Sequence, residues 1–173
     1  MKTALTIAAA AAMLLAGAAQ AQTTTATAEL KNAVGAGVGK VTLTEAPKGV
    51  LMRIEAQGLP PGWHGLHFHA VGDCSKSDFT SAGPHVHGAA DAVHGLLNPR
   101  ANEMGDLPNL YADMHGGAAG EFFTTLVSLR GAGGRPALID GDGSAVVIHA
   151  SADDHSTQPI GGAGARIACA VIK

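Results

Sequence analysis

The histidines are the residues of this chain best suited to chemistry, and two of them stand two positions apart in Gly65-Leu66-His67-Phe68-His69. This segment has the character of a β-strand, in which residues i and i+2 point to the same face. Two neutral imidazoles on one face make half of a site for copper or zinc. Alone the pair is a weak signal, because two unrelated surface histidines would look the same. It gains weight from the residues that follow at intervals: His85, His94, Asp106 and His149.

Strands and loops must position these side chains, since the sequence shows no amphipathic helix longer than a turn or two. Alternating apolar and polar residues predict strands over 28–33, 39–45 and 49–57, and we expect further strands over 63–70, 122–129, 145–149 and 165–172. The interval 72–109 lacks strand periodicity but holds Cys74, His85, His87 and His94. A loop of that length is usually functional or disordered, and its ligand-type residues favour a functional loop pinned by metal. Many short strands with long loops indicate an all-β Greek-key sandwich or barrel.

The length of 173 residues suits one domain, preceded by a segment for export. Lys2 is followed by an apolar, alanine-rich run over 4–19, and Ala19-Gln20-Ala21 fits the small-x-small rule for cleavage. We therefore predict a signal peptide at 1–21 and a mature domain at 22–173. A membrane anchor is the alternative, but the run is short and no basic stop-transfer cluster follows it.

Charge and cysteine content narrow the class of protein further. The formal charge is −3, and removing Lys2 with the signal leaves 10 basic and 14 acidic side chains. A net negative chain argues against binding to nucleic acid or to an anionic membrane surface. The only two cysteines are Cys74 and Cys169, and export to an oxidising compartment favours a disulfide between them over two free thiols.

The order of the motifs resembles the copper–zinc superoxide dismutase family over residues 29–173. After His67-x-His69, the resemblance is carried by Ser81-Ala82-Gly83-Pro84-His85, His94-Gly95, Gly105-Asp106-Leu107-Pro108, Val147-Ile148-His149 and Gly164-Ala165-Arg166-Ile167-Ala168-Cys169. The exported, glycine-rich chain looks like the bacterial periplasmic branch of that family. The resemblance implies a Greek-key β-sandwich, or flattened eight-stranded barrel, with long metal-binding and electrostatic loops.

The resemblance also implies a role for each residue of the site. His67, His69 and His149 match the ligands of copper alone, and His85 matches the histidine that bridges copper and zinc. His94 and Asp106 match zinc ligands. The remaining matches are Asp153, a carboxylate that links a copper histidine to a zinc histidine; Arg166, the active-site arginine beside copper; and Cys74 with Cys169, the intrasubunit disulfide.

One position departs from the family pattern. The family usually has a zinc-binding histidine three residues before the aspartate of Gly-Asp-Leu-Pro, where this chain has Glu103. Three hypotheses follow: Glu103 ligates zinc through its carboxylate, His87 supplies the missing nitrogen, or the site holds zinc weakly through His85, His94 and Asp106 alone. A carboxylate in place of a neutral histidine would make the site one unit more negative.

The resemblance implies an enzyme that converts superoxide to dioxygen and hydrogen peroxide by redox cycling of copper, protecting the periplasm. Because the mature chain is net negative, capture of the anion must depend on a local positive field at Arg166 and copper. The expected partner is superoxide, with no nucleic acid and, after removal of the signal, no membrane; homodimer and monomer both stay open. The alternative is a non-catalytic protein of the same fold that buffers or delivers copper and zinc.

Overall fold

The computed structural model of this chain describes residues 24–88 and 90–173. The predicted signal peptide at 1–21 lies outside the described residues. The described part is almost entirely strand and loop, with two short 3-10 turns at Thr80–Ala82 and Ala132–Gly134. Its strands are β1 (Thr25–Asn32), β2 (Gly37–Ala46), β3 (Gly49–Ala56), β4 (Gly62–His64), β5 (Leu66–His69), β6 (Leu110–Ala112), β7 (Ala118–Thr124), β8 (Ser144–His149) and β9 (Arg166–Ile172).

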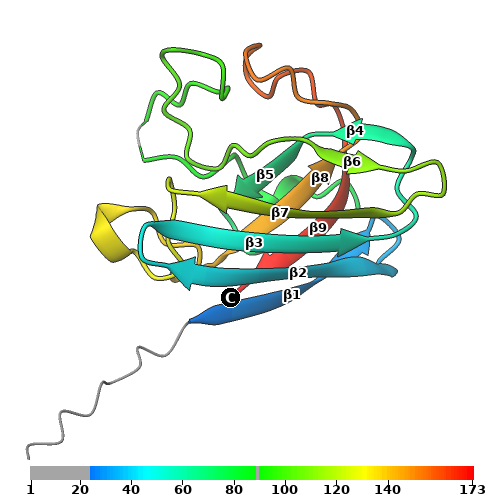
Figure 1. The fold of residues 1–173 in the computed structure, drawn as a ribbon, viewed down its shortest axis with the longest axis horizontal. Coiled ribbons are helices and arrows are strands. Elements are labelled where there is room, and N and C mark those ends of the chain that lie inside the picture. Colours follow the sequence, from blue (N-terminus) through cyan, green and yellow to red (C-terminus); the bar gives the residue numbers. More distant parts are fainter. Residues whose placement is uncertain (1–23, 89) are drawn as a thin grey trace, which may run out of the picture.

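Seven of these strands form one antiparallel sheet in the order β5-β8-β9-β1-β2-β3-β7. The sheet curls, so that β5, β8 and β9 cross behind β1, β2, β3 and β7 (Figure 1). β9 returns to lie beside β1, next to the β1-β2-β3 meander, which is a Greek-key arrangement. The predicted all-β class is confirmed, with seven strands in the main sheet and a separate ladder of β4 and β6 in the described part.

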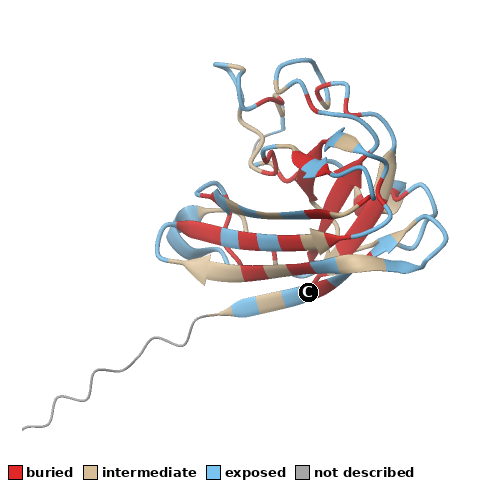
Figure 2. Cartoon of the chain, turned by 45° about the vertical axis from the view of Figure 1, so that its right-hand side comes forward, coloured by how far each residue is buried: buried red, intermediate tan, exposed pale blue. Residues whose placement is uncertain are grey.

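The core lies inside the curl and is filled by alternate residues of each strand. In β3, Val50, Met52 and Ile54 are fully buried while Leu51 is exposed, which is the period of two expected for a sheet with one face on the core. Figure 2 shows buried and exposed residues alternating along the strands of this face of the sheet. By contrast, every residue of β5 and of β8 is buried. Both faces of these two strands are therefore covered, one by the core and the other by loops.

Two strand predictions need correction, and one strand was missed. The predicted strand 63–70 is divided at Gly65, where the backbone leaves β6 and begins to pair with β8. The predicted strand 122–129 instead begins at Ala118 and ends at Thr124, because Ala118–Thr124 pairs with residues 50–56 of β3 and the chain leaves the sheet after Thr124. β6 was not predicted, since three residues between a proline-rich loop and a turn carry too little pattern. Pairing with a neighbouring strand outweighs local propensity in each case.

The two long loops agree with the sequence pattern. The described residues of the interval 72–109 hold only a short 3-10 turn and isolated β-bridges, and 150–165 has no strand. Both loops lie at the same end of the molecule, over β5 and β8 (Figure 1). Among the described residues, no helix has the length and apolar character needed to cross a membrane.

Candidate metal centre

The structure brings the predicted metal-ligating residues together in two adjoining groups. The histidine cluster consists of His67, His69, His85 and His149, and the second group contains His67, His85, His94 and Asp106. Within each group the candidate ligand atoms all lie within 4.8 Å of one another, and every residue in both groups is buried. His67 and His85 belong to both groups, so the two form one continuous centre.

Strand geometry accounts for the position of three histidines. Leu66 and Phe68 of β5 face the core, so that His67 and His69 face the opposite side, beneath the loops. β8 pairs with β5 from Ala145 to Ile148 and ends at His149, whose ring therefore reaches the same place. The predicted His-x-His pair is thus completed by the end of a neighbouring strand.

The free edge of β5 holds the loop ligands. β5 is the terminal strand of the sheet, and two loop segments add short pairings to its unpaired side. One segment places His85 opposite His69, and the other places Asp106 opposite His67. Gly105 lies against the backbone of Phe68, where a Cβ atom would come within 2.2 Å of the Phe68 carbonyl oxygen. Only glycine fits there, and this close approach sets the position of Asp106.

Four buried ring nitrogens of the histidine cluster have no hydrogen-bond partner: His67 Nδ1, His69 Nε2, His85 Nε2 and His149 Nε2. The other nitrogen of each ring is engaged. His69 Nδ1 donates to the Gly83 carbonyl oxygen at 2.9 Å, and His149 Nδ1 donates to that of Gly164 at 3.0 Å. A ring that donates from one nitrogen presents a lone pair on the other. In their neutral form the four rings therefore offer four converging lone pairs, a donor set that suits copper or zinc.

Burial keeps most of these rings neutral. It lowers the pKa of His69 well below its usual value, and burial with the neighbouring His67 lowers the pKa of His149 to about 3. Burial also lowers the pKa of His67, outweighing the opposing effect of its hydrogen bond with Asp153. Neutral imidazole is the form that ligates a metal ion, so these rings are in the required state at neutral pH.

The second group is completed by a residue outside the two groups named above. Glu103 Oε2 lies 2.8 Å from His85 Nδ1 and 3.0 Å from His94 Nδ1, and Asp106 Oδ1 lies 3.1 Å and 3.0 Å from the same two nitrogens. We call His85, His94, Glu103 and Asp106 the carboxylate–histidine cluster. Burial lowers the pKa of His94, but its hydrogen bonds with Asp106, Asp153 and Glu103 outweigh burial and raise the pKa to about 11. Without a cation, the carboxylates thus hold a proton in the cluster.

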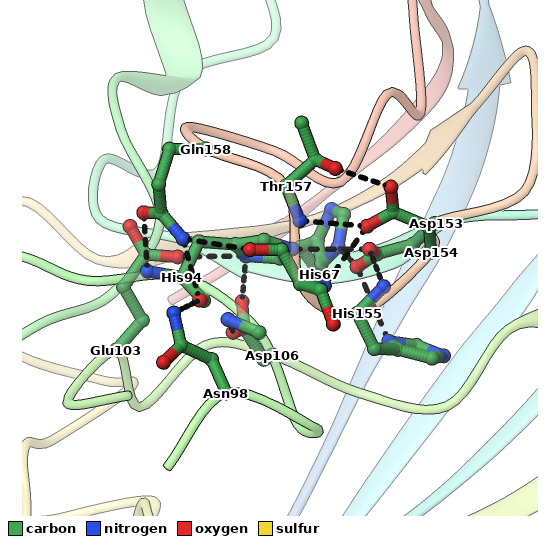
Figure 3. A network of polar contacts seen from close by, with 12 residues as sticks. His67, His94, Asn98, Glu103, Asp106, Asp153, Asp154, His155, Thr157 and Gln158 are labelled. Atoms are coloured by element: carbon green, nitrogen blue, oxygen red, sulfur yellow. Dashed lines mark hydrogen bonds and ion pairs between the residues drawn. The ribbon is translucent and has the colours of Figure 1, made fainter. Parts of the chain in front are cut away.

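Asp153 connects the two clusters through its two carboxylate oxygens (Figure 3). Oδ2 accepts from His67 Nε2 at 2.8 Å, and Oδ1 accepts from His94 Nε2 at 3.0 Å and from the backbone N–H of His155 at 2.6 Å. Burial opposes ionisation of this side chain, but these three hydrogen bonds outweigh burial and hold its pKa well below the usual range. Gly161, at a φ of +59°, leaves the space that the carboxylate occupies, because a Cβ there would lie 1.7 Å from Oδ1.

Two side-chain amides hold the backbone of the centre. Asn109 accepts from the N–H of Asp153 at 2.9 Å and donates to its carbonyl oxygen at 2.8 Å. Gln158 does the same for His94, at 2.9 Å and 2.8 Å. The loop 150–165 is therefore attached to the loop 72–109 by two bidentate contacts. Sequence reasoning missed both residues, because nothing local distinguishes an amide that folds back onto a distant backbone.

Arg166 stands at the start of β9 and borders the histidine cluster. Its guanidinium donates to the carbonyl oxygen of Phe79 at 2.6 Å and to that of Gly83 at 2.8 Å. The Gly83 carbonyl also accepts from His69, so the cation and the cluster share an acceptor. No carboxylate of the described residues forms an ion pair with Arg166, so its charge stays available to an anion.

The predicted disulfide joins Cys74 to Cys169, 95 residues apart, with their Cα atoms 5.9 Å apart. The disulfide attaches β9, the strand that carries Arg166, to the loop whose Phe79 and Gly83 carbonyls bind the guanidinium.

Two other histidines lie beside the centre. The ring nitrogens of His64 hydrogen-bond the carbonyl oxygens of His149 and Pro60, each at 2.7 Å, so this ring holds the backbone in place. His155 is half-buried, and its Nδ1 lies 3.4 Å from Asp153 Oδ2.

Comparison with known proteins agrees with this geometry. A family model described as copper/zinc superoxide dismutase (SODC) matches residues 38–172. A Cu-Zn superoxide dismutase of Caulobacter vibrioides is 63% identical over 147 residues, which cover 85% of this chain and 84% of that protein. Another, from Aquifex aeolicus, is 40% identical over 147 residues, covering 84% and 85% of the two chains.

Solved structures give the same result. The Cu/Zn superoxide dismutase from Brucella abortus superposes with a TM-score of 0.69 at 29% identity, covering 87% of this chain and all of that one. A SOD-like protein from Bacillus subtilis superposes with a TM-score of 0.78 at 35% identity, covering 85% and 97% of the two chains. With a family match over most of its length and a relative at 63% identity, this chain belongs to the copper/zinc superoxide dismutase family.

Proposed function

We propose that this chain dismutates superoxide, with copper held by His67, His69, His85 and His149. The observation that carries the proposal is the set of four buried, unpartnered nitrogens that face one another in the histidine cluster. Leaving four such atoms without partners costs free energy unless an ion occupies the space between them. The family to which the chain belongs supplies the identity of that ion and of the reaction.

We propose zinc for the neighbouring cluster, with His85, His94 and Asp106 as ligands and Asp153 as the residue that orients His67 and His94. His85 offers Nδ1 to this cluster and Nε2 to the histidine cluster, so a single ring belongs to both metal sites. A carboxylate that accepts from the outer nitrogen of a ligating imidazole fixes its tautomer and its orientation. Asp153 does this for one ring in each cluster.

Two superoxide ions and two protons give one dioxygen and one hydrogen peroxide. Copper, when bound, supplies the one-electron oxidation of the first superoxide and the one-electron reduction of the second. The chain's own residues bind the anion and move the protons. We assign to Arg166 the binding and orientation of superoxide beside the histidine cluster, because its guanidinium is fixed by two carbonyls and has no carboxylate partner among the described residues. We assign to His85 Nε2, in the state in which it would not hold copper, a proton kept between the two steps.

We propose that residues 1–21 direct export and that the mature protein, 22–173, works in the periplasm. The alanine-rich run and Ala19-Gln20-Ala21 support cleavage before Gln22. The Cys74–Cys169 disulfide supports an oxidising compartment, because disulfides are rare in reducing cytosol. N-terminal sequencing of protein recovered from a periplasmic extract should begin at Gln22; recovery of the uncleaved chain in the cytosol would contradict this proposal.

The test of function is superoxide decay followed by stopped-flow absorbance, using protein loaded with copper and zinc. We expect fast decay with the wild-type protein and decay near the rate of buffer with His69→Ala, whose ring supplies one of the four nitrogens. Copper and zinc contents are measured on both samples, so that a lost metal and a lost activity are distinguished. Copper bound to the wild type without decay of superoxide would favour the buffering alternative and contradict the proposed function.

A further inference from the structure

We infer that Glu103 is the fourth zinc ligand of this protein, making a site of two imidazoles and two carboxylates. The inference rests on the proposed zinc site and extends it to the position at which the chain departs from its family. The relevant atoms are His85 Nδ1, His94 Nδ1, Asp106 Oδ1 and Glu103 Oε2.

These four atoms form a closed ring of contacts. Each nitrogen lies beside both carboxylates, and the four nitrogen–oxygen distances are 2.8, 3.0, 3.1 and 3.0 Å. Zinc with four tetrahedral ligands at ~2.0–2.2 Å separates neighbouring ligand atoms by roughly 3.3–3.6 Å. The observed separations are shorter by roughly 0.2–0.8 Å, so an outward movement of the four side chains by less than an ångström admits the ion.

The backbone holds Glu103 at this position from both sides. On the side of His94, the N–H groups of Asn102 and Glu103 donate to the Val93 carbonyl, and the Asn102 side chain accepts from the Val93 N–H. On the side of His85, the N–H groups of Met104 and Gly105 donate to the Val86 carbonyl. The segment 102–105 is therefore attached to the neighbours of both zinc histidines, which directs the Glu103 side chain between them.

Burial supports a ligand role over a solvated carboxylate. The Glu103 side chain is 9% exposed, compared with 2% for His85 and 1% for Asp106. Burying a second carboxylate beside the first raises the free energy of the folded protein unless cations compensate both charges. A divalent ion between the two oxygens and the two nitrogens supplies that compensation, and with neutral rings it balances both negative charges.

The structure gives His87 a different place. His87 is the backbone bridge partner of Glu103, but its ring nitrogens are not among the atoms that contact His85 or His94 in the described chain. Glu103 also borders a surface hollow lined in part by Leu96, Met104 and Leu126. Substituted side chains at 103 therefore have room to be accommodated without disturbing the core, which makes the position suitable for variants.

The test compares Glu103→Gln, Glu103→His and His87→Ala with the wild-type chain, each prepared without metal. Zinc affinity is measured by competition with a chromophoric chelator, and cobalt(II) absorption reports the ligand set independently of activity. Loss of an outer partner of a metal ligand costs roughly 10–100-fold in affinity. We therefore expect Glu103→Gln to lower zinc affinity by at least about 100-fold and to alter the cobalt(II) spectrum. Glu103→His should bind zinc tightly, and His87→Ala should have the zinc affinity of the wild type.

Either of two results would overturn the inference: wild-type affinity in Glu103→Gln, or a loss in His87→Ala as large as that in Glu103→Gln. In both cases the zinc site and the proposed function stand, provided that His94→Ala still abolishes zinc binding. Failure of the proposed function has a different signature, in which the wild-type chain binds copper and zinc but does not consume superoxide.

Discussion

The Asp153→Asn variant separates the two metal sites, because an amide can replace only one of the two carboxylate oxygens. The oxygen at the Oδ1 position must remain an oxygen, since the backbone N–H of His155 points at it from 2.6 Å and His94 Nε2 donates to it from 3.0 Å. The amide NH2 group therefore takes the Oδ2 position, 2.8 Å from His67 Nε2. Two N–H donors then face each other.

His67 escapes this conflict only by changing tautomer. With Nε2 accepting from the amide, the proton of the ring moves to Nδ1, the nitrogen that faces the histidine cluster. Copper must displace that proton and break the new hydrogen bond. Losing a charge-assisted hydrogen bond of this kind costs ~1.5–3 kcal/mol. At ~1.4 kcal/mol for each tenfold change, copper affinity should fall by about 10–150-fold.

Zinc affinity should fall far less, by under about tenfold, because His94 keeps an oxygen acceptor. Both affinities are measured by chelator competition on metal-free protein, and the copper EPR spectrum reports the altered His67 ligand. Asp154→Asn is the matched control, since it makes the same charge change at a carboxylate whose hydrogen-bond partners among the described residues are Ser156 and Thr157. Unchanged copper affinity in Asp153→Asn, or loss of zinc with copper retained, would refute this reasoning.

Three other predictions follow from the same contacts. Arg166→Glu should keep both metals but slow superoxide decay by about 10–1000-fold and reverse the sign of its salt dependence, because it replaces the steering charge with a repulsive one; an unchanged rate would contradict the role of Arg166. Gln158→Ala removes two hydrogen bonds to the His94 backbone, at ~0.5–1.5 kcal/mol each, and should lower zinc affinity by about tenfold, whereas equal affinity would show that the contact is dispensable. In metal-free protein, stability should peak near the unfolded histidine pKa of ~6.5. As the pH falls below 6.5, His149 binds a proton in the unfolded chain but not in the folded chain, where its pKa is about 3, so stability falls. As the pH rises above 6.5, His94 loses its proton in the unfolded chain but keeps it in the folded chain, where its pKa is about 11, so stability falls again. Urea midpoints measured at pH 5, 6.5 and 8.5 test this, and a midpoint that changes in one direction only would contradict it.

Local patterns explain how much of the molecule could be predicted. Alternation over β2 and β3 is regular enough to identify both strands, and the short apolar run of β8 identifies a third. His67-x-His69 requires only the two-residue period of a strand to place both rings on one face. The disulfide followed from two cysteines in an exported chain, and the structure confirms the pairing. Each of these inferences uses information that lies within a few residues or in the composition.

What could not be predicted depends on contacts between distant segments. The start of β7 is set by its pairing with β3, although Ala118 and Gly120 have little strand propensity. Gln158 reaches the backbone of His94 from 64 residues away, and nothing in the sequence around it marks that role. The sequence likewise left both Glu103 and His87 open, with Glu103 only slightly preferred, because the side chain that turns toward His85 depends on how 102–105 pairs with Val86 and Val93.

The central claim is that copper in the histidine cluster makes this chain a superoxide dismutase, and a copper titration tests it most directly. Metal-free protein is filled with zinc and then given copper in small increments, with the rate of superoxide decay measured after each addition. We expect the rate to rise in proportion to copper, up to one copper per chain, and then to stay constant. A rate that does not depend on bound copper, or that stays at the level of buffer with one copper bound, would contradict it.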